Sequence, residues 1–567
     1  MKRLLKYSCL VVLACLPGFV AQARVINIDA SAIKGDFTMQ LREKCEQASY
    51  DDTVVLTFGN GTYTIDGTIQ LKCNVVIKGQ GQDRSIIMFN HGHDRNGKKA
   101  YTSDAFFKIT GTLQRNISVS ISDIAFTIKD HDGIWWKNGE RYAIKIYHAN
   151  NVDVHDISSS MANAYITNMD LHVCSNVNVT NCTFTNYNNC ETGGCLWVRG
   201  EMHNVTIRNN KFYKYGKDET LAIYDQLVDH TKEYVRGVAS RTDILVEDNE
   251  FHYGGYNRKD KDPEANCSMI FSLFTEENTE SKDCCTTRNF MMRNNRFYVD
   301  DVTARCIYIA FNPADVHNGI VVENNQIINT DIKRSYRYYH TDIEVHDASR
   351  SAATDTIRIL NNTVKNSNVV INPDGASSYA FLRVHGGNLL VKGNKVVNTA
   401  TTNPVKNQAA GVRALWCGAE GGDVTMLDNV FKGVYYLGYF TSSKGADLVT
   451  FNARNNYFSG DTRIYCNNIK QVRLNFTGNT LMSDNMNFFL EEFADRGSVV
   501  FNNNDVTVRD GNGQLMTHWS KSDISKKRFE LLEVKNNVIR GIKNENELFK
   551  NVVNVKKRKV SNNRITR

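Results

Sequence analysis

The chain has 567 residues, a formal net charge of +7 and only 5 prolines, and 41% of its residues are hydrophobic. This mild basic excess allows an acidic ligand, whereas the spread of the basic residues along the chain disfavours nucleic acid as a partner. The scarcity of proline favours a chain dominated by sheet pairing.

The first residues predict an export signal. A basic start, an apolar run to Val20 and the small residues Ala21 to Ala23 are typical of a cleaved secretory signal, here over residues 1–23. The alternative is a lipoprotein signal that ends at Cys15. The apolar run is too short to cross a bilayer, and no later stretch approaches the ~18 apolar residues of a membrane helix. We therefore expect an exported, periplasmic or extracellular monomer without a membrane span.

The next predicted element is a helix over residues 36–49. Asp36 is a suitable N-cap, and Phe37, Leu41 and Cys45 follow at helical spacing. Such a helix would cover the open edge of the first strands, which would otherwise invite aggregation. We expect any helix to be confined to this start.

From residue 121 to the C-terminus one short phrase recurs: an apolar residue, any residue, Asn, Asp or Gly, usually Asn, any residue, and an apolar residue. Ile207–Phe212, Val246–Phe251 and Val534–Ile539 are clear copies. The shortest spacings between copies, 23 to 27 residues, match one turn of a three-strand β-coil. Such a repeat predicts a solenoid whose units bury their apolar faces against their neighbours. We assign the Asn residues a structural role, since Asn tolerates left-handed backbone angles and its amide can bond to neighbouring coils.

Three early segments, residues 54–63, 74–81 and 85–88, resemble the opening of the pectate-lyase-like superfamily, although the usual Pro before the Gly-x-Tyr turn is absent. The resemblance implies an all-β, single right-handed parallel β-helix over residues 24–567 that acts on a polysaccharide. We expect about sixteen coils, each rising roughly 4.8 Å, and hence a rod on the order of 75 Å long.

Twelve of the 14 cysteines follow Ala23, so disulfides are possible in an exported chain. Candidate pairs are Cys45 with Cys73, Cys190 with Cys195, and Cys284 or Cys285 with Cys267 or Cys306. Buried unpaired thiols are the alternative.

The longest spacings lie in residues 212–394, where added loops point to a working face. A second strand follows the Asn phrase there, and strict alternation of its aliphatic residues predicts which neighbours point outward. These outward residues are Trp197, Arg199, Tyr224, Tyr308, Glu344, His346, Arg383, His385 and Trp416. Stacked from coil to coil they would form one stripe, either a substrate groove or a surface on which loops pack.

The residue types of the stripe suit an acidic glycan. Sugar rings stack on Trp197 and Trp416, while Arg199 or Arg383 would neutralise a uronate carboxylate. His346 or His385 would act as the base, and Tyr224, Tyr308 or Tyr339 as the acid. Glu344 and a basic, aromatic loop are further candidates for binding substrate. The loop residues are Arg334, Arg337, Tyr339 and His340.

The leading hypothesis is therefore a polysaccharide lyase. A glycoside hydrolase would need two carboxyl groups across one bond, which Asp225, Glu276 and Glu344 could supply. A non-catalytic glycan-binding or adhesion rod is the third alternative. Calcium is a possible cofactor, and Asp225, Glu276 and Glu277 are its candidate ligands.

Overall fold

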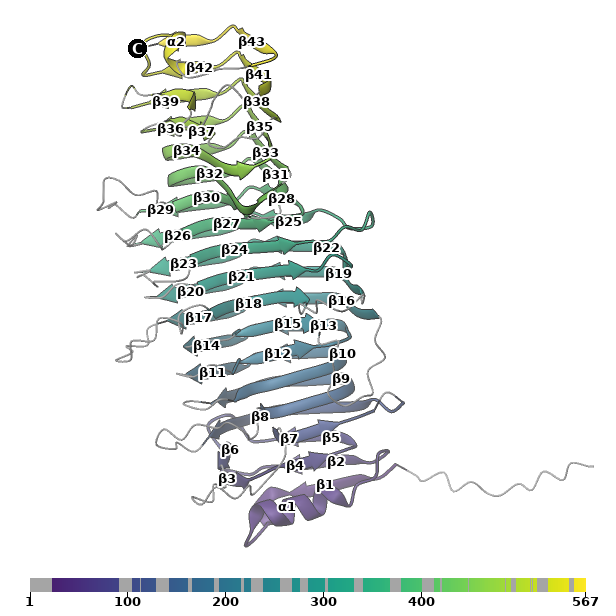
Figure 1. Ribbon diagram of the computed structural model, residues 1–567. Helices are drawn as coiled ribbons and strands as arrows, with labels where there is room; N and C mark the ends of the chain where they lie inside the picture. The colour runs from purple at the N-terminus through teal and green to yellow at the C-terminus, as the bar shows by residue number, and fades with distance from the viewer. Residues whose placement is uncertain are drawn as a thin grey trace, which may run out of the picture.

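The structure is a computed structural model in which the chain winds into a long rod of stacked β-strands, with α1 at one end and the C-terminus at the other (Figure 1). It describes residues 23–90, 105–112, 114–128, 142–161, 166–187, 193–215, 219–225, 238–254, 268–275, 284–300, 304–330, 340–367, 379–399, 412–418, 421–446, 448–484, 486–490, 496–509, 511, 513–517, 529–549 and 555–566. The predicted signal, including Cys15, lies outside these residues. No helix among them is long and apolar enough to cross a bilayer.

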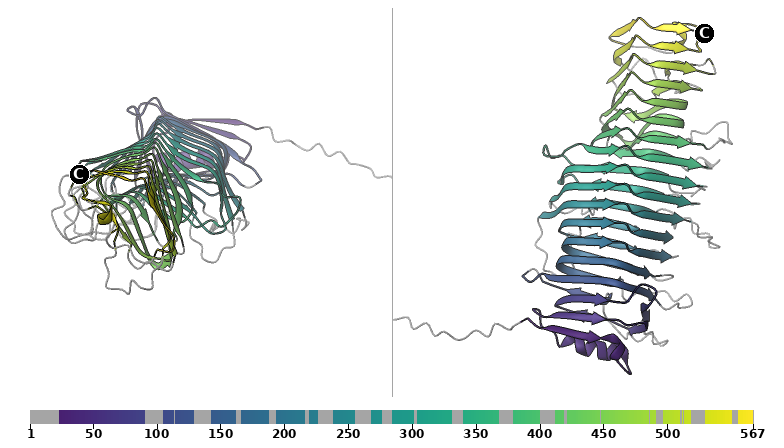
Figure 2. Two further views of the ribbon diagram at one scale, coloured as in Figure 1. Left: turned by 90° about the horizontal axis from the view of Figure 1, so that it is seen from above. Right: turned by 180° about the vertical axis from the view of Figure 1, so that it is seen from behind.

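Each coil contributes strands to three faces, and every strand of a coil pairs in parallel with its counterpart in the next coil (Figures 1 and 2). The first face comprises β4 Ile69–Leu71, β7 Ala105–Thr110, β9 Tyr142–Ser160, β10 Thr167–Thr180, β12 Leu196–Arg199, β15 Leu221–Asp225, β18 Ser268–Thr275, β21 Ala304–Phe311, β24 His340–Asp347, β27 Tyr379–His385, β30 Val412–Cys417, β32 Val430–Ala446, β34 Tyr457–Ile469, β37 Asn487–Leu490 and β40 Gln514–Thr517. The long strands β9, β10, β32 and β34 continue around a corner onto a neighbouring face.

The second face follows each first-face strand and carries the residues that lead into the Asn phrase. It comprises β1 Val25–Asp29, β2 Thr53–Thr57, β5 Asn74–Lys78, β8 Ile117–Ile128, β13 Met202–Arg208, β16 Val238–Glu247, β19 Cys284–Arg293, β22 Val316–Glu323, β25 Ile357–Leu360, β28 Asn388–Lys392, β31 Gly422–Leu427, β33 Val449–Arg454, β35 Gln471–Thr477, β38 Arg496–Asn502, β41 Phe529–Lys535 and β43 Arg558–Ser561.

The third face begins directly after the Asn phrase. It comprises β3 Gly61–Asp66, β6 Ser85–Asn90, β11 Thr183–Tyr187, β14 Lys211–Tyr215, β17 Glu250–Gly254, β20 Arg296–Asp300, β23 Gln326–Thr330, β26 Thr363–Ser367, β29 Lys395–Asn398, β36 Thr480–Ser483, β39 Asp505–Val508, β42 Val538–Arg540 and β44 Arg564–Thr566. Its inward side carries a phenylalanine stack: the rings of Phe212, Phe251 and Phe297 lie nearly parallel, with centroids 4.9 and 4.7 Å apart.

Two neighbouring positions of the Asn phrase have different structural roles. The first, such as Asn209 or Asp248, adopts a left-handed backbone with φ near 56°, which only Gly, Asn and Asp tolerate readily. The second is a buried Asn whose side chain bonds to the next coil. Asn210 Nδ2, for example, donates to Asn249 Oδ1 at 3.0 Å, and the same carboxamide oxygen accepts the Asn210 backbone N–H at 2.9 Å. The predicted structural role of the phrase is confirmed.

The predicted capping helix is present as α1, Phe37–Glu46. The Asp36 side chain accepts the Met39 N–H, and Leu41 and Cys45 are buried against the first coil. The expectation that helices are confined to the start is wrong in one detail. A one-turn helix, α2 Glu545–Leu548, lies near the C-terminus, where Asn544 caps it and Leu548 is buried. A 3-10 turn, η1 Ala30–Ala32, precedes α1.

The apolar core fills the inside of the coils along the rod. Several described cysteines lie in it as free, buried thiols, namely Cys45, Cys73, Cys195 and Cys306, and Cys285 is buried as well. The proposed disulfide between Cys45 and Cys73 is therefore absent from the structure, and both residues are unpaired thiols. Cys190 and Cys267 lie outside the described residues, as does the side chain of Cys284.

The first face bends where two consecutive residues point inward. Cys306 and Ile307 are both buried, and the partly exposed Arg305 and Tyr308 stand on either side of them. The same step recurs at Ala414–Leu415 in β30 and at the equivalent positions of β24 and β27. Because of this bend, Arg305, three positions before Tyr308, and Arg413, three positions before Trp416, also face outward. Strict alternation would place both of them inside.

Candidate functional site

The register of four neighbouring strands brings the middle of the predicted stripe together. Tyr308 of β21 pairs with Glu344 of β24, which pairs with Arg383 of β27, which pairs with Trp416 of β30. A second line, two residues further along each strand, runs from Ala310 through His346 to His385. Since neighbouring strands are about 4.8 Å apart, these side chains are direct neighbours although they are distant in sequence.

Glu344 is the centre of this group. It points outward but is buried beneath its neighbours. Its carboxylate accepts hydrogen bonds from His346 Nε2 at 2.6 Å, Arg383 Nη1 at 3.2 Å and Thr341 Oγ1 at 3.1 Å. Arg305 Nε lies 3.5 Å from Glu344 Oε2, the oxygen that also accepts the Thr341 hydroxyl. Two guanidinium groups thus flank one carboxylate, and the buried charge is compensated as buried charges require.

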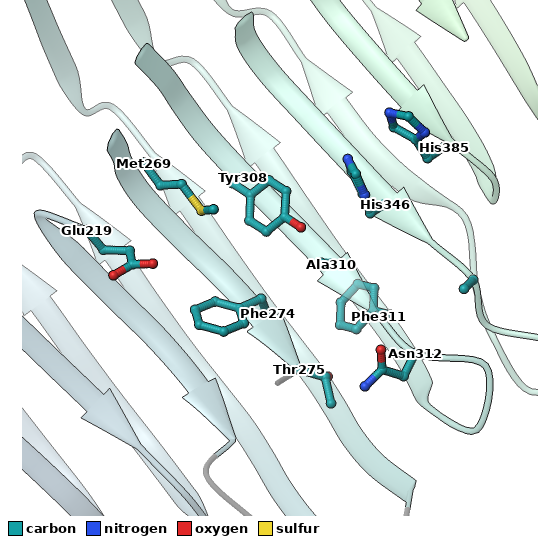
Figure 3. Close-up of a pocket in the computed structure, with 11 residues that line it drawn as sticks. Glu219, Met269, Phe274, Thr275, Tyr308, Ala310, Phe311, Asn312, His346 and His385 are labelled. Atoms are coloured by element: carbon teal, nitrogen blue, oxygen red, sulfur yellow. The ribbon is translucent and has the colours of Figure 1, made fainter. Parts of the chain in front are cut away.

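The two histidines lie against one another at the wall of a pocket of about 300 Å³. Their ring centroids are 4.0 Å apart, and the ring of Tyr308 lies 5.3 Å from that of His346. Figure 3 shows these three side chains projecting from adjacent strands, with Phe274 on the strand before Tyr308 and Asn312 at the end of the Tyr308 strand. The described lining residues are Glu219, Met269, Phe274, Thr275, Tyr308, Ala310, Phe311, Asn312, His346, Ala348 and His385.

His385 is held in a narrow slot. Its ring lies between His346 and the backbone of Gly418, where a Cβ added to the glycine would overlap the imidazole. Burial, followed by the influence of His346 and the nearby arginines, lowers the pKa of His385 to about 2. His385 is therefore neutral at any physiological pH, and its buried Nε2 has no hydrogen-bond partner in the part of the chain that the structure describes.

Trp416 ends the cluster on the C-terminal side. The Arg383 guanidinium lies over its ring at 4.4 Å from the centroid, and the Arg413 guanidinium lies 4.8 Å from the same ring. The indole Nε1 donates to Thr441 Oγ1 at 3.4 Å, which fixes the orientation of the ring.

Three further residues of the predicted stripe form a separate cluster. Arg199 donates from Nε to Asp170 at 2.6 Å and pairs with it a second time through Nη2. Trp197 and Tyr224 pack against this guanidinium. Burial raises the pKa of Tyr224, and Arg199 itself is only 4% exposed. This cluster is well packed and lies apart from the histidine pair.

The remaining predicted site residues fall elsewhere. Arg334, Arg337, Tyr339, Glu276 and Glu277 lie outside the described residues. His340 begins β24 but is buried; its Nδ1 accepts the Ala304 N–H at 3.1 Å, and its ring stacks on Tyr379. Asp225 ends β15 and is buried.

Two groups of described residues present donor atoms close enough for a metal ion. One is Glu344 with His346 and His385, and the other is Cys306 with His340 and Asp342. Both sets contain nitrogen or sulfur, whereas calcium prefers oxygen ligands alone. Neither set therefore fits calcium, and a calcium site at Asp225, Glu276 and Glu277 stays a prediction.

Sequence reasoning missed two arginines of the site, Arg305 and Arg413. Strict alternation places both inside the coil, because it counts back from Ile307 and Leu415. In each strand two consecutive residues point inward, Cys306 with Ile307 and Ala414 with Leu415, so the residue before them points outward. An arginine at an apparently inward position of an apolar strand was the available signal, since an unpaired buried charge is costly.

No protein-family model matches this chain, and no curated protein sequence matches it. Among solved structures, an exopolygalacturonase from Thermotoga maritima is 12% identical with a TM-score of 0.44, covering 71% of this chain and 91% of its own. A PL6 alginate lyase is 9% identical with a TM-score of 0.41, covering 81% and 86%. A DFA-IIIase from Arthrobacter chlorophenolicus A6 is 13% identical with a TM-score of 0.40, covering 71% and 94%. Similarity at this level carries no information on the substrate.

Proposed function

We propose that the protein is an exported polysaccharide lyase that cleaves an acidic, uronate-containing glycan by β-elimination on its first face. The observation that carries the proposal is the hydrogen bond between Glu344 and His346 at an open pocket, with Tyr308 on the same wall. With Arg305 and Arg383 close to Glu344, this arrangement supports assigning a base, a proton donor and positive charge to one group of side chains.

β-Elimination makes three demands on a site. A cation must neutralise the uronate carboxylate, a base must remove the proton from C5, and an acid must protonate the leaving oxygen. The C5 proton goes to the base, the C4–O bond breaks, and its electron pair stays with the leaving oxygen. A double bond forms between C4 and C5.

We assign the base to His346. When its Nε2–H is donated to Glu344, Nδ1 of the neutral ring is the acceptor, and the carboxylate fixes both the tautomer and the ring orientation. His385 suits this role less well, because a group whose pKa is lowered to about 2 is a weak base. Its slot against Gly418 instead holds the ring on which His346 packs.

The other two roles fall to neighbours of His346. Tyr308 lines the pocket beside the His346 ring, and its hydroxyl is the proton donor to the leaving oxygen. Among the described residues, Arg305 and Arg383 bring two positive charges against the carboxylate of Glu344, next to the histidine that lines the pocket, and this charge favours a uronate.

A glycoside hydrolase is less well supported by the pocket. That reaction needs two carboxyl groups about 5 to 9.5 Å apart across one glycosidic bond. Of the described residues that line the pocket, Glu219 is the only one with a carboxyl group, and Glu344 is buried behind the histidine.

The test is to incubate the purified protein with polygalacturonate, alginate and chondroitin sulfate. The proposal expects new ultraviolet absorbance from an unsaturated uronate at the non-reducing end of the product. New reducing ends without that absorbance would point to hydrolysis, and binding without either product would point to a glycan-binding rod. Either of these results would overturn the assignment as a lyase.

A further inference from the structure

The first face continues past the histidine pair as a ladder of aromatic side chains. Trp416 of β30 pairs with Tyr439 of β32, which pairs with Tyr465 of β34. The rings of Tyr439 and Tyr465 are stacked, with centroids 4.9 Å apart and planes 16° apart. Trp416 and Tyr439 are half-buried, so part of each ring is open to solvent.

Arg413 lies beside this ladder because of the bend in the strand. Its guanidinium is 4.1 Å from the ring centroid of Tyr439, 4.8 Å from that of Trp416 and 5.9 Å from that of Tyr436. The side chain is only 3% exposed, and its Nε and Nη1 are buried and make no hydrogen bond to any described residue. No carboxylate among the residues that the structure describes forms an ion pair with it.

Two other buried arginines of the rod are satisfied by the protein. Arg199 forms a two-pronged ion pair with Asp170. Arg241 donates to Thr287 Oγ1, Thr275 Oγ1 and the Phe274 carbonyl oxygen. The described groups around the Arg413 guanidinium are the aromatic side chains of Tyr439, Trp416 and Tyr436. Stacking on aromatic rings offsets part of the cost of burying a guanidinium. It leaves N–H groups that could donate two parallel hydrogen bonds to an oxyanion.

We propose that Arg413, with Trp416 and Tyr439, forms a binding subsite for a second acidic sugar unit of the glycan. The carboxylate of that unit pairs with the guanidinium, while its ring packs on the exposed parts of the two aromatic side chains. This inference rests on the acidic-glycan class of the proposed function, but not on the elimination reaction.

The spacing indicates an oligomeric ligand. Trp416 lies three strands away from Tyr308 along the line of paired residues that runs through Glu344 and Arg383. At about 4.8 Å for each strand, this distance is roughly 14 Å. A single sugar ring is much shorter than this, so a ligand that reaches both Tyr308 and Arg413 spans several units.

The experiment measures binding by calorimetry in a His346→Gln background, so that the glycan is not consumed. The probes are oligosaccharides of polygalacturonate, alginate and chondroitin, each compared with its carboxyl-reduced form. The variants are Arg413→Met, which keeps volume but removes the charge, Arg413→Lys, and Arg288→Met as a control. Arg288 is an exposed arginine on the second face.

We expect the His346→Gln parent to bind at least one acidic probe more tightly than its carboxyl-reduced form. Arg413→Met should weaken binding of the acidic form roughly tenfold or more and leave the reduced form nearly unchanged. Arg413→Lys should fall between the two, since lysine keeps the charge without the fork, and Arg288→Met should match the parent. Melting temperatures of the variants establish that they fold.

The subsite is overturned if Arg413→Met preserves the parent's preference for the acidic over the reduced form, or if the parent shows no such preference. The proposed lyase activity fails separately, when no unsaturated product forms from any probe while the dependence on Arg413 persists.

Discussion

Two arginine–carboxylate clusters of the first face, around Arg199 and around Glu344, contain the same kinds of residue but differ in their access to solvent. In the cluster nearer the N-terminus, one arginine, Arg199, meets one carboxylate, Asp170, and aromatic rings cover the pair. In the other, Glu344 meets two arginines and a histidine, and that histidine lines a pocket.

Residue type alone therefore does not identify which part of the stripe binds a ligand. A buried, one-to-one ion pair satisfies both charges and leaves nothing for a ligand to compensate. Among the described residues of the Glu344 cluster two arginines face one carboxylate, and His346 is 34% exposed. We therefore expect substitutions in the Arg199 cluster to change stability, and substitutions in the Glu344 cluster to change activity.

The largest effect is expected for His346→Gln. Loss of a positioned general base should lower kcat by about 10²- to 10⁴-fold. The melting temperature should change little, because the side chain is partly exposed and Glu344 keeps its two arginines. Turnover is measured from the absorbance of the unsaturated product.

The matched control for this substitution is His252→Gln. His252 is also partly exposed, and it stacks between Tyr213 and Tyr298 on the third face. It should keep full activity. Full activity in His346→Gln would remove that residue from the mechanism.

The second prediction compares one arginine from each cluster. Arg199→Ala should destabilise the fold by about 3 to 5 kcal/mol, because it leaves the Asp170 carboxylate buried without its partner. Arg383→Ala should cost less stability, since Glu344 still contacts Arg305 and His346, but it should lower kcat by about 10²-fold or more. Denaturant unfolding and turnover measured on both variants check the pair. Equal loss of stability in the two would remove the distinction between the clusters.

These two clusters also mark how far the sequence could be interpreted. The repeated Asn phrase predicts the solenoid because its two positions have separate physical demands, a left-handed backbone and a side-chain ladder, which few residues meet. Alternation within the strands predicts that His346 and His385 face outward on adjacent coils. It cannot distinguish a closed ion pair from an open one, since that depends on Asp170, a residue of an earlier coil.

Two features of the site depend on geometry that no periodic pattern contains. The bend in the first face reverses the parity of Arg305 and Arg413, so alternation places them in the core. The slot for His385 depends on the absence of a side chain at Gly418, and glycine after a strand ordinarily indicates a turn.

The third prediction uses that slot. Gly418→Ala places a methyl group where the His385 ring now lies, so the ring must move and His346 loses the surface on which it packs. We expect kcat to fall roughly tenfold, by analogy with small displacements of catalytic groups. In a double-mutant cycle, Gly418→Ala should have little further effect in a His385→Ala background, where the overlap is gone. Additive losses in the cycle would contradict the slot.

The smallest effect concerns pH. His385 is neutral in the folded protein down to a pKa of about 2, whereas an unfolded histidine has a pKa near 6.5. Between these values the unfolded chain binds the extra proton, so the stability that this residue contributes falls as the pH falls below about 6.5, by at most about 1.4 kcal/mol per pH unit. Above pH 7 both states are neutral and the contribution is constant. In His385→Gln this slope should disappear, so the unfolding curves of the parent and the variant should converge in acid. The measurement is denaturant unfolding of both proteins from pH 4 to pH 8, and a constant difference across that range would mean that the ring is not held neutral by its burial.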